Sequence, residues 1–201
     1  MPLLDRAGTR RAALALAVFS LAAPASAGPG PDHRPQVAQY FDSHVAGWIG
    51  SEPIVAALRA QNAENVRLTQ GEIDELDATW RAQMASEGNR RPLVQAVMDR
   101  EASRYLKERQ READWMIVEI IVMDAKGLNV ALSTPSSDYW QGDEAKHQKT
   151  FQAASRVTQI DAVEYEAETG LLLSQVNKTI FDPDTGRPIG AVTVSVNMNK
   201  L

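Results

Sequence analysis

The chain has 201 residues, and 21 Lys and Arg against 26 Asp and Glu give it a formal net charge of −5 at pH 7. Nucleic acids and anionic lipid surfaces are bound through basic patches, so this acidic balance argues against both as partners. The sequence contains no cysteine, which excludes disulfides, thiolate nucleophiles, iron–sulfur clusters and cysteine-based zinc sites.

Residues 1–27 have the three-part pattern of a cleavable secretory signal. Arginines open the segment, residues 12–23 are apolar, and residues 25–27 are Ala-Ser-Ala, the small residues that signal peptidase requires. The apolar run is shorter than the roughly 20 residues of a membrane-spanning helix, although a retained anchor is the alternative. We therefore expect a periplasmic or secreted protein without membrane insertion after cleavage, and a disordered linker at residues 28–35.

Residues 36–113 are predicted to be helical. Apolar residues recur at helical spacing between residues 37 and 48, and a proline suits the first turn of a helix at residues 51–60. Thr69 and Glu72 have the spacing of a capping box, which starts a further helix. A last helix is expected from Pro92 to about residue 112.

Residues 114–201 are predicted to form a sheet. A continuous β-branched run indicates a buried strand, and turn residues separate four further strands. The expected strands are residues 116–123, 128–133, 162–167, 171–181 and 189–198, in meander order, with a long insertion at 134–154. Helices followed by strands predict one α+β domain over residues 36–201 with an antiparallel sheet.

The second half resembles the extracytoplasmic Cache (PAS-like, PDC-type) sensor domains. The resemblance rests on three stretches: Glu-Ile-Ile-Val-Met-Asp-Ala-Lys-Gly-Leu-Asn-Val-Ala at 119–131, Ser-Asp-Tyr-Trp-Gln-Gly-Asp-Glu at 137–144, and the hairpin at 180–192. It implies N-terminal helices packed on a five- to six-stranded antiparallel sheet. It also implies a small ligand held between that sheet and a lid at residues 138–149. A stand-alone exported domain of this kind would signal through a partner such as a membrane receptor or transducer.

Six lid residues are the candidates for ligand binding. Tyr139 and Trp140 offer flat walls, Asp138 could anchor an ammonium group, and a lysine could meet a carboxylate. The full set is Asp138, Tyr139, Trp140, Asp143, Lys146 and Lys149. The alternative is that the aromatic residues cap the core and that Asp138 satisfies a turn amide. Gln175 and Asn177 share one strand face, which could equally face solvent.

The sequence favours a binding protein over an enzyme. It has no nucleophile–base order, phosphate loop or metalloprotease motif, and no catalytic residue, metal or cofactor is expected. Asp182-x-Asp184-x-Gly186 lacks the later ligands of a calcium loop and is better explained as a hairpin turn. The predicted ligand is an amino acid, amine or short carboxylate. The alternative function is an envelope interaction module that docks on a membrane receptor without a small-molecule ligand. A homodimer along the first helix is also expected.

Overall fold

The computed structural model describes residues 32–86, 88, 90–167 and 169–201. The predicted signal at residues 1–27 and the beginning of the predicted linker lie outside the described residues. Within the described ranges, no helix is both long enough and apolar enough to cross a membrane.

The first half of the described chain is helical, as predicted. Its helices are α1 (Arg34–His44), α2 (Glu52–Asn65), α3 (Gln70–Ala85), α4 (Pro92–Met98) and α5 (Glu101–Glu112). The capping box of α3 is confirmed, because Thr69 and Glu72 each accept the other's backbone N–H. Helix α1 begins inside the predicted linker, since Pro35 occupies its first turn, where a missing N–H costs nothing.

The helix predicted from Pro92 to about residue 112 is interrupted between α4 and α5. Arg100 has extended backbone angles, with φ −62° and ψ 148°. Its side chain turns inward, where Nη1 donates to Gln61 Oε1 at 2.5 Å and to the Val130 carbonyl at 2.9 Å. These hydrogen bonds tie the interruption to α2 and to the sheet.

The second half forms a six-stranded antiparallel sheet with a short helical insertion. The strands are β1 (Ile117–Met123), β2 (Asn129–Leu132), β3 (Gln159–Ile160), β4 (Glu164–Glu166), β5 (Leu171–Phe181) and β6 (Pro188–Asn197). The α+β class and the antiparallel sheet are therefore confirmed. The insertion between β2 and β3 contains α6 (Ala145–His147) and the π-helical turn η1 (Gln148–Gln152).

The predicted meander order is wrong, because the last strand lies in the middle of the sheet. The order is β2-β1-β6-β5-β3, and β4 also pairs with β5. Strands β1 and β2 pair with each other and form the first hairpin. Val122 pairs with Val192 and Val176 pairs with Val194, so β6 joins this first hairpin to β5. The two-residue strand β3 was not predicted.

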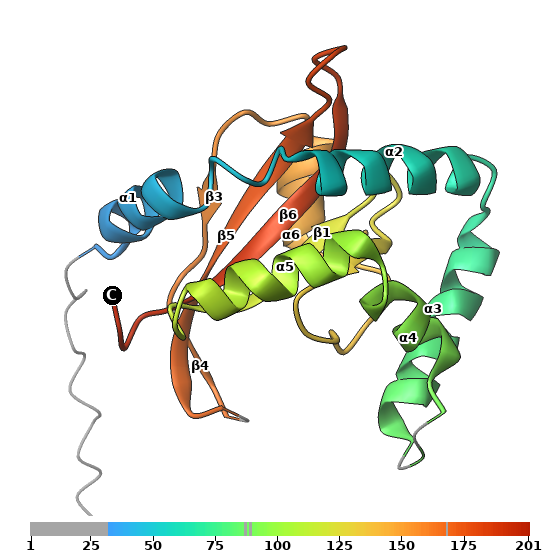
Figure 1. Cartoon of the computed structure of the whole chain (residues 1–201), viewed down its shortest axis with the longest axis horizontal. Helices are drawn as coiled ribbons and strands as arrows, with labels where there is room; N and C mark the ends of the chain where they lie inside the picture. Colours follow the sequence, from blue (N-terminus) through green and yellow to red (C-terminus); the bar gives the residue numbers. More distant parts are fainter. Residues whose placement is uncertain (1–31, 87, 89, 168) are drawn as a thin grey trace, which may run out of the picture. The chain divides into compact units, whose positions relative to one another are not determined.

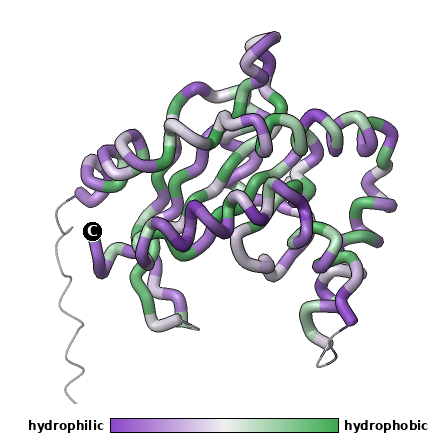
Figure 2. The backbone as a smooth tube through the Cα atoms, viewed as in Figure 1, coloured by the Kyte–Doolittle hydropathy of each residue, from purple (hydrophilic) through white to green (hydrophobic). Residues whose placement is uncertain are grey.

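One face of the sheet packs against helices. Figure 1 shows α2 and α5 crossing in front of β5 and β6, with α6 behind the sheet. The apolar residues on this face include Ile120, Val122, Val192, Val194 and Val196. Val37 and Phe41 of α1 are buried in the same core. Part of the apolar face of α1 therefore packs within this chain and is not available to a second copy. Figure 2 shows the central strands as largely hydrophobic and α5 as largely hydrophilic on its outward side.

Candidate functional site

The opposite face of the sheet is covered by the insertion at residues 134–154. This insertion contains the lid predicted at residues 138–149, and from here on the whole insertion is called the lid. Its first part lies beside β2, because the Asn129 N–H donates to the Tyr139 carbonyl and the Gln141 N–H donates to the Gly127 carbonyl. Gly127 has a φ of +85°, and a Cβ on it would lie 2.4 Å from the Cα of Gly142. Glycine is therefore required at this close contact between the first hairpin and the lid.

The two lid aromatics that were predicted to bind a ligand, Tyr139 and Trp140, make contacts within the protein. Tyr139 is 5 % exposed and stacks on Trp80 of α3, with ring centroids 5.2 Å apart. The indole N–H of Trp140 donates to the Lys126 carbonyl at 2.8 Å. Asp77 of α3 accepts both their backbone N–H groups, at 2.9 and 3.1 Å. This part of the lid is thus a structural clamp between α3 and the first hairpin.

The charged lid residues differ in their surroundings. The Asp138 carboxylate lies 3.1 Å from Arg81 Nε and is 31 % exposed. Asp143 and Lys149 are exposed. The Lys146 side chain is only 11 % exposed and its Nζ lies 3.2 Å from Glu144 Oε2. Of the six candidate residues, the structure brings only Lys146 to the cleft described below.

A row of polar side chains lies on the lid-facing side of the central strands. Strand register places Glu119 opposite Ser195, and Ser195 opposite Gln175. In the next row, the Thr193 hydroxyl donates to Asn177 Oδ1 at 2.7 Å. Asn177 and Gln175 therefore face the lid and not open solvent. The helix-facing side of β1 and β6 carries the buried apolar residues Ile120, Val122, Val192, Val194 and Val196. The lid-facing side of the same strands therefore differs from it in carrying polar side chains.

A cleft of about 650 Å³ opens between the lid helix and β4–β5. Its lining residues are Glu144, Ala145 and Lys146 of the lid, residues 161–162 and 164–167, and Leu173 and Gln175 of β5. Asp161 is held at the rim, because its carboxylate accepts Asn177 Nδ2 at 2.7 Å. Its carbonyl is hydrogen-bonded to the His33 ring at 2.9 Å, which ties the residue before α1 to this rim.

Glu119 of β1 is not a lining residue of the cleft, but it interacts electrostatically with three residues that line it, Lys146, Glu166 and Glu144. Burial raises the pKa of the Glu119 carboxyl above its usual value. The nearby Lys146 ammonium opposes this shift, whereas the Glu166 and Glu144 carboxylates add to it. Glu119, Asp161, Thr193 and Ser195 were not among the predicted site residues. The signal that could have identified them is the alternation of polar residues along two apolar strands.

The Asp182-x-Asp184-x-Gly186 hairpin contacts an arginine. Arg59 of α2 donates to Asp182 through Nε at 2.7 Å and Nη2 at 2.9 Å, and to Asp184 at 2.6 Å. The Arg59 guanidinium holds the pKa of the Asp182 carboxyl well below its usual range. Among the described residues, no cluster of three or more His, Asp or Glu side chains could hold a metal ion.

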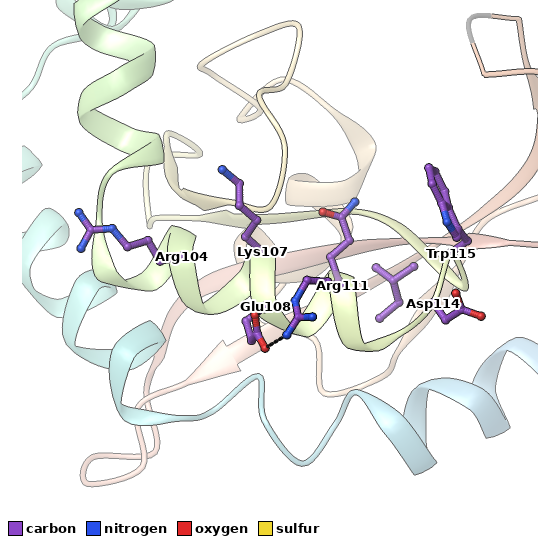
Figure 3. A pocket seen from close by; sticks show the side chains of 8 residues that line it. Arg104, Lys107, Glu108, Arg111, Asp114 and Trp115 are labelled. Atoms are coloured by element: carbon purple, nitrogen blue, oxygen red, sulfur yellow. Dashed lines mark hydrogen bonds and ion pairs between the residues drawn. The ribbon is translucent and has the colours of Figure 1, made fainter.

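A second groove, of about 540 Å³, follows the outward side of α5. Figure 3 shows Arg104, Lys107 and Arg111 along the helix, with Trp115 beyond its end. The Trp115 side chain is 70 % exposed. Asp114 and Trp115 both have positive φ angles, 46° and 65°, an uncommon conformation for a bulky residue.

The chain is similar in fold to several solved sensor domains. The sensor domain of the V. cholerae histidine kinase DctB matches 83 % of this chain, with 13 % identity and a TM-score of 0.43. The ligand-binding domain of the Campylobacter jejuni chemoreceptor Tlp3, in complex with 4-methylisoleucine, matches 78 %, with 10 % identity and a TM-score of 0.39. That of the Pseudomonas aeruginosa PAO1 amino acid chemoreceptor PctC, in complex with GABA, matches 84 %, with 9 % identity and a TM-score of 0.36.

This chain spans less than two thirds of each of those chains: 55 %, 64 % and 63 % respectively. No protein-family model matches the sequence, and no curated protein matches it.

Proposed function

We propose that the chain is an exported, Cache-like binding domain that holds a small polar metabolite in the cleft between the lid helix and β4–β5. The observation that carries this proposal is the polar row beneath the lid. Polar side chains are costly to bury unless they are hydrogen-bonded. A row of them on the central strands of a sheet is therefore typical of a functional surface more than of a packing core. Thr193 and Asn177 satisfy each other and Asp161 within the protein, whereas Gln175 lines the cleft and would face a ligand with polar groups.

The charges around the cleft favour a ligand with a positive group. Carboxylates of Glu144, Asp161, Glu164 and Glu166 line the cleft, and Glu119 lies beside it. Opposite charge stabilises an ammonium in a partly desolvated site far more than in water. Gln175 provides both an amide donor and an acceptor for the rest of the ligand. Amines and amino acids fit this description better than short carboxylates.

Ligand binding can be tested directly on the purified protein. A thermal-shift screen should include primary amines, amino acids and short carboxylates. A ligand at about 100 times its dissociation constant adds roughly 2.7 kcal/mol, which moves the melting midpoint by several degrees. We expect the shift from amines or amino acids.

The substitution Glu119→Gln should remove that shift while raising stability at neutral pH, because it deletes a carboxylate whose charged form is disfavoured by burial. Glu75→Gln is the matched control, since Glu75 is exposed on α3. A ligand response that survives Glu119→Gln would place the binding site elsewhere.

Export and signalling are parts of the same proposal. The signal at residues 1–27 would deliver the domain to the periplasm or the outside of the cell. A bound metabolite would then be reported through a membrane receptor or transducer. Fractionation of cells that express the full chain tests the first step, and N-terminal sequencing of the exported form should begin near Gly28.

A docking module is the second candidate function, and Trp115 favours it. Large exposed aromatics beside cations are typical of interaction surfaces. The strained Trp115 backbone is held in place, because Asn197 Nδ2 donates to its carbonyl at 3.1 Å. The partner would present acidic groups to Arg104 and Lys107, because Arg111 is already paired with Glu108. Under this function the protein would bind no metabolite. Trp115→Ala would abolish binding to the membrane receptor that serves as partner, whereas Tyr165→Ala would leave the docking unchanged.

A further inference from the structure

Lys146 is the one cation among the described residues that line the cleft, and carboxylates surround it. The lining includes Glu144, Asp161, Glu164 and Glu166, and Lys146 also acts on Glu119. One lysine among these acids occupies the place where an incoming ammonium group would be most strongly attracted.

The burial of Lys146 is unusual for its position. Lysine side chains normally extend their ammonium group into water, and Lys149, one helical turn further along the lid, is exposed in this way. Lys146 is instead 11 % exposed, with its Nζ 3.2 Å from the Glu144 carboxylate. The ammonium is paired with Glu144, and the other acidic residues that line the cleft add to its attraction.

The segment that carries Lys146 has little regular structure to hold it. Ala145–His147 is a three-residue helical turn, and the chain continues as the five-residue π-helical turn η1. Single π-helical turns are rare and occur often at functional sites. The long side chain can leave the cleft by rotamer changes while the clamp around Tyr139 and Trp140 stays in place.

We propose that the Lys146 ammonium is a tethered competitor, which occupies the cation position of the cleft until an ammonium-bearing ligand displaces it. This inference rests on the proposed function. It assigns Lys146 a role opposite to the carboxylate partner expected from the sequence. Because only the fraction of molecules with Lys146 displaced can accept the ligand, the apparent affinity is reduced by that fraction. Lys146 thereby sets a threshold concentration for binding.

The test compares Lys146→Met with Lys149→Met in the purified protein. Both substitutions remove one positive charge from the lid and keep an unbranched side chain. Calorimetric titrations use n-butylamine as the probe and butyrate as the anion of similar size. We expect Lys146→Met to bind n-butylamine about tenfold more tightly than the wild type, and Lys149→Met to match the wild type. Equal or weaker amine binding by Lys146→Met, or loss of butyrate binding, would overturn the proposal.

A second measurement tests, without any ligand, whether Lys146 is the cation that acts on the carboxylates of the cleft. The pKa of Glu119 can be followed by NMR titration of its carboxyl carbon. Loss of the nearby cation should raise the Glu119 pKa in Lys146→Met and leave it unchanged in Lys149→Met. If no variant binds any amine or amino acid, the proposed function fails. A raised Glu119 pKa would then still support Lys146 as the cation of the cleft, and equal values in the two variants would refute it.

Discussion

Replacing Tyr139 by alanine should destabilise the protein strongly, because the structure places this side chain in the core and not in the cleft. Tyr139 is 5 % exposed and stacks on Trp80 with the rings 16° apart. Truncation of a buried aromatic side chain to alanine costs about 3–5 kcal/mol. In a domain of this size, 1 kcal/mol moves the melting midpoint by roughly 2–4 °C, so the expected drop is about 6–20 °C.

Thermal unfolding followed by circular dichroism measures this change, and urea unfolding followed by tryptophan fluorescence checks it. Tyr165→Ala is the matched control, because Tyr165 is 67 % exposed on β4 and its removal should cost less than about 1 kcal/mol. Similar midpoints for the two variants would refute the packing argument. That result would instead favour the role predicted for Tyr139 from the sequence, in which its ring forms a wall of the ligand pocket.

Three further changes test the lid and the last hairpin. Burial lowers the pKa of His147, so the unfolded state takes up the proton more readily. Stability should therefore fall as the pH drops below about 6.5, and His147→Gln should show a smaller fall in urea titrations. Gly142→Ala would place a Cβ 2.4 Å from Trp140 Nε1 and should cost about 1–3 kcal/mol in the same assay. Arg59→Ala should destabilise the protein at pH 7, and the penalty should shrink as Asp182, whose pKa Arg59 lowers, becomes protonated in acid.

Each of these changes has a clear contrary outcome. A His147→Gln curve parallel to that of the wild type would mean that another group carries the pH dependence. Gly50 has no atom within 4 Å of an added Cβ, so Gly50→Ala is the control for Gly142→Ala, and equal effects would count against the close contact. Because the loss starts only below the ordinary Asp pKa of about 3.9 and is completed well below it, a penalty for Arg59→Ala that stays constant from about pH 5 to about pH 2 would show that the ion pair does not stabilise the hairpin.

Local patterns made much of the fold predictable. The capping box of Thr69 and Glu72 uses groups three residues apart, so the chain nearby determines it. The strand runs were recognisable because side chains in a strand alternate between two faces or stay apolar when both faces are covered.

Long-range pairing was not predictable in the same way. The position of β6 between β1 and β5 depends on contacts between residues such as Val122 and Val192, which lie far apart in the sequence. The interruption at Arg100 has the same origin, because its side chain bonds to Gln61 and to Val130 and no proline or glycine marks the site. Local propensity carries no information about either arrangement.

The sequence predicts the insertion between β2 and β3, and the structure has it. Of the six residues predicted there for ligand binding, only Lys146 lines the cleft, and a binding role for it stays a prediction. Tyr139 and Trp140 suggested a binding wall because aromatic residues suit both pockets and cores, and only packing distinguishes the two. Glu119 was overlooked because it interrupts a run that otherwise indicates a buried apolar strand.

The central position of β6 also determines when this domain can fold. Until residues 188–197 have been synthesised, the first hairpin and β5 have no strand to join them. The β1–β2 hairpin and the β4–β5 pair can form earlier, but the sheet is completed only when β6 pairs with both β1 and β5. Contacts between segments that are distant in the sequence form slowly, so this pairing is expected to be a late step in folding.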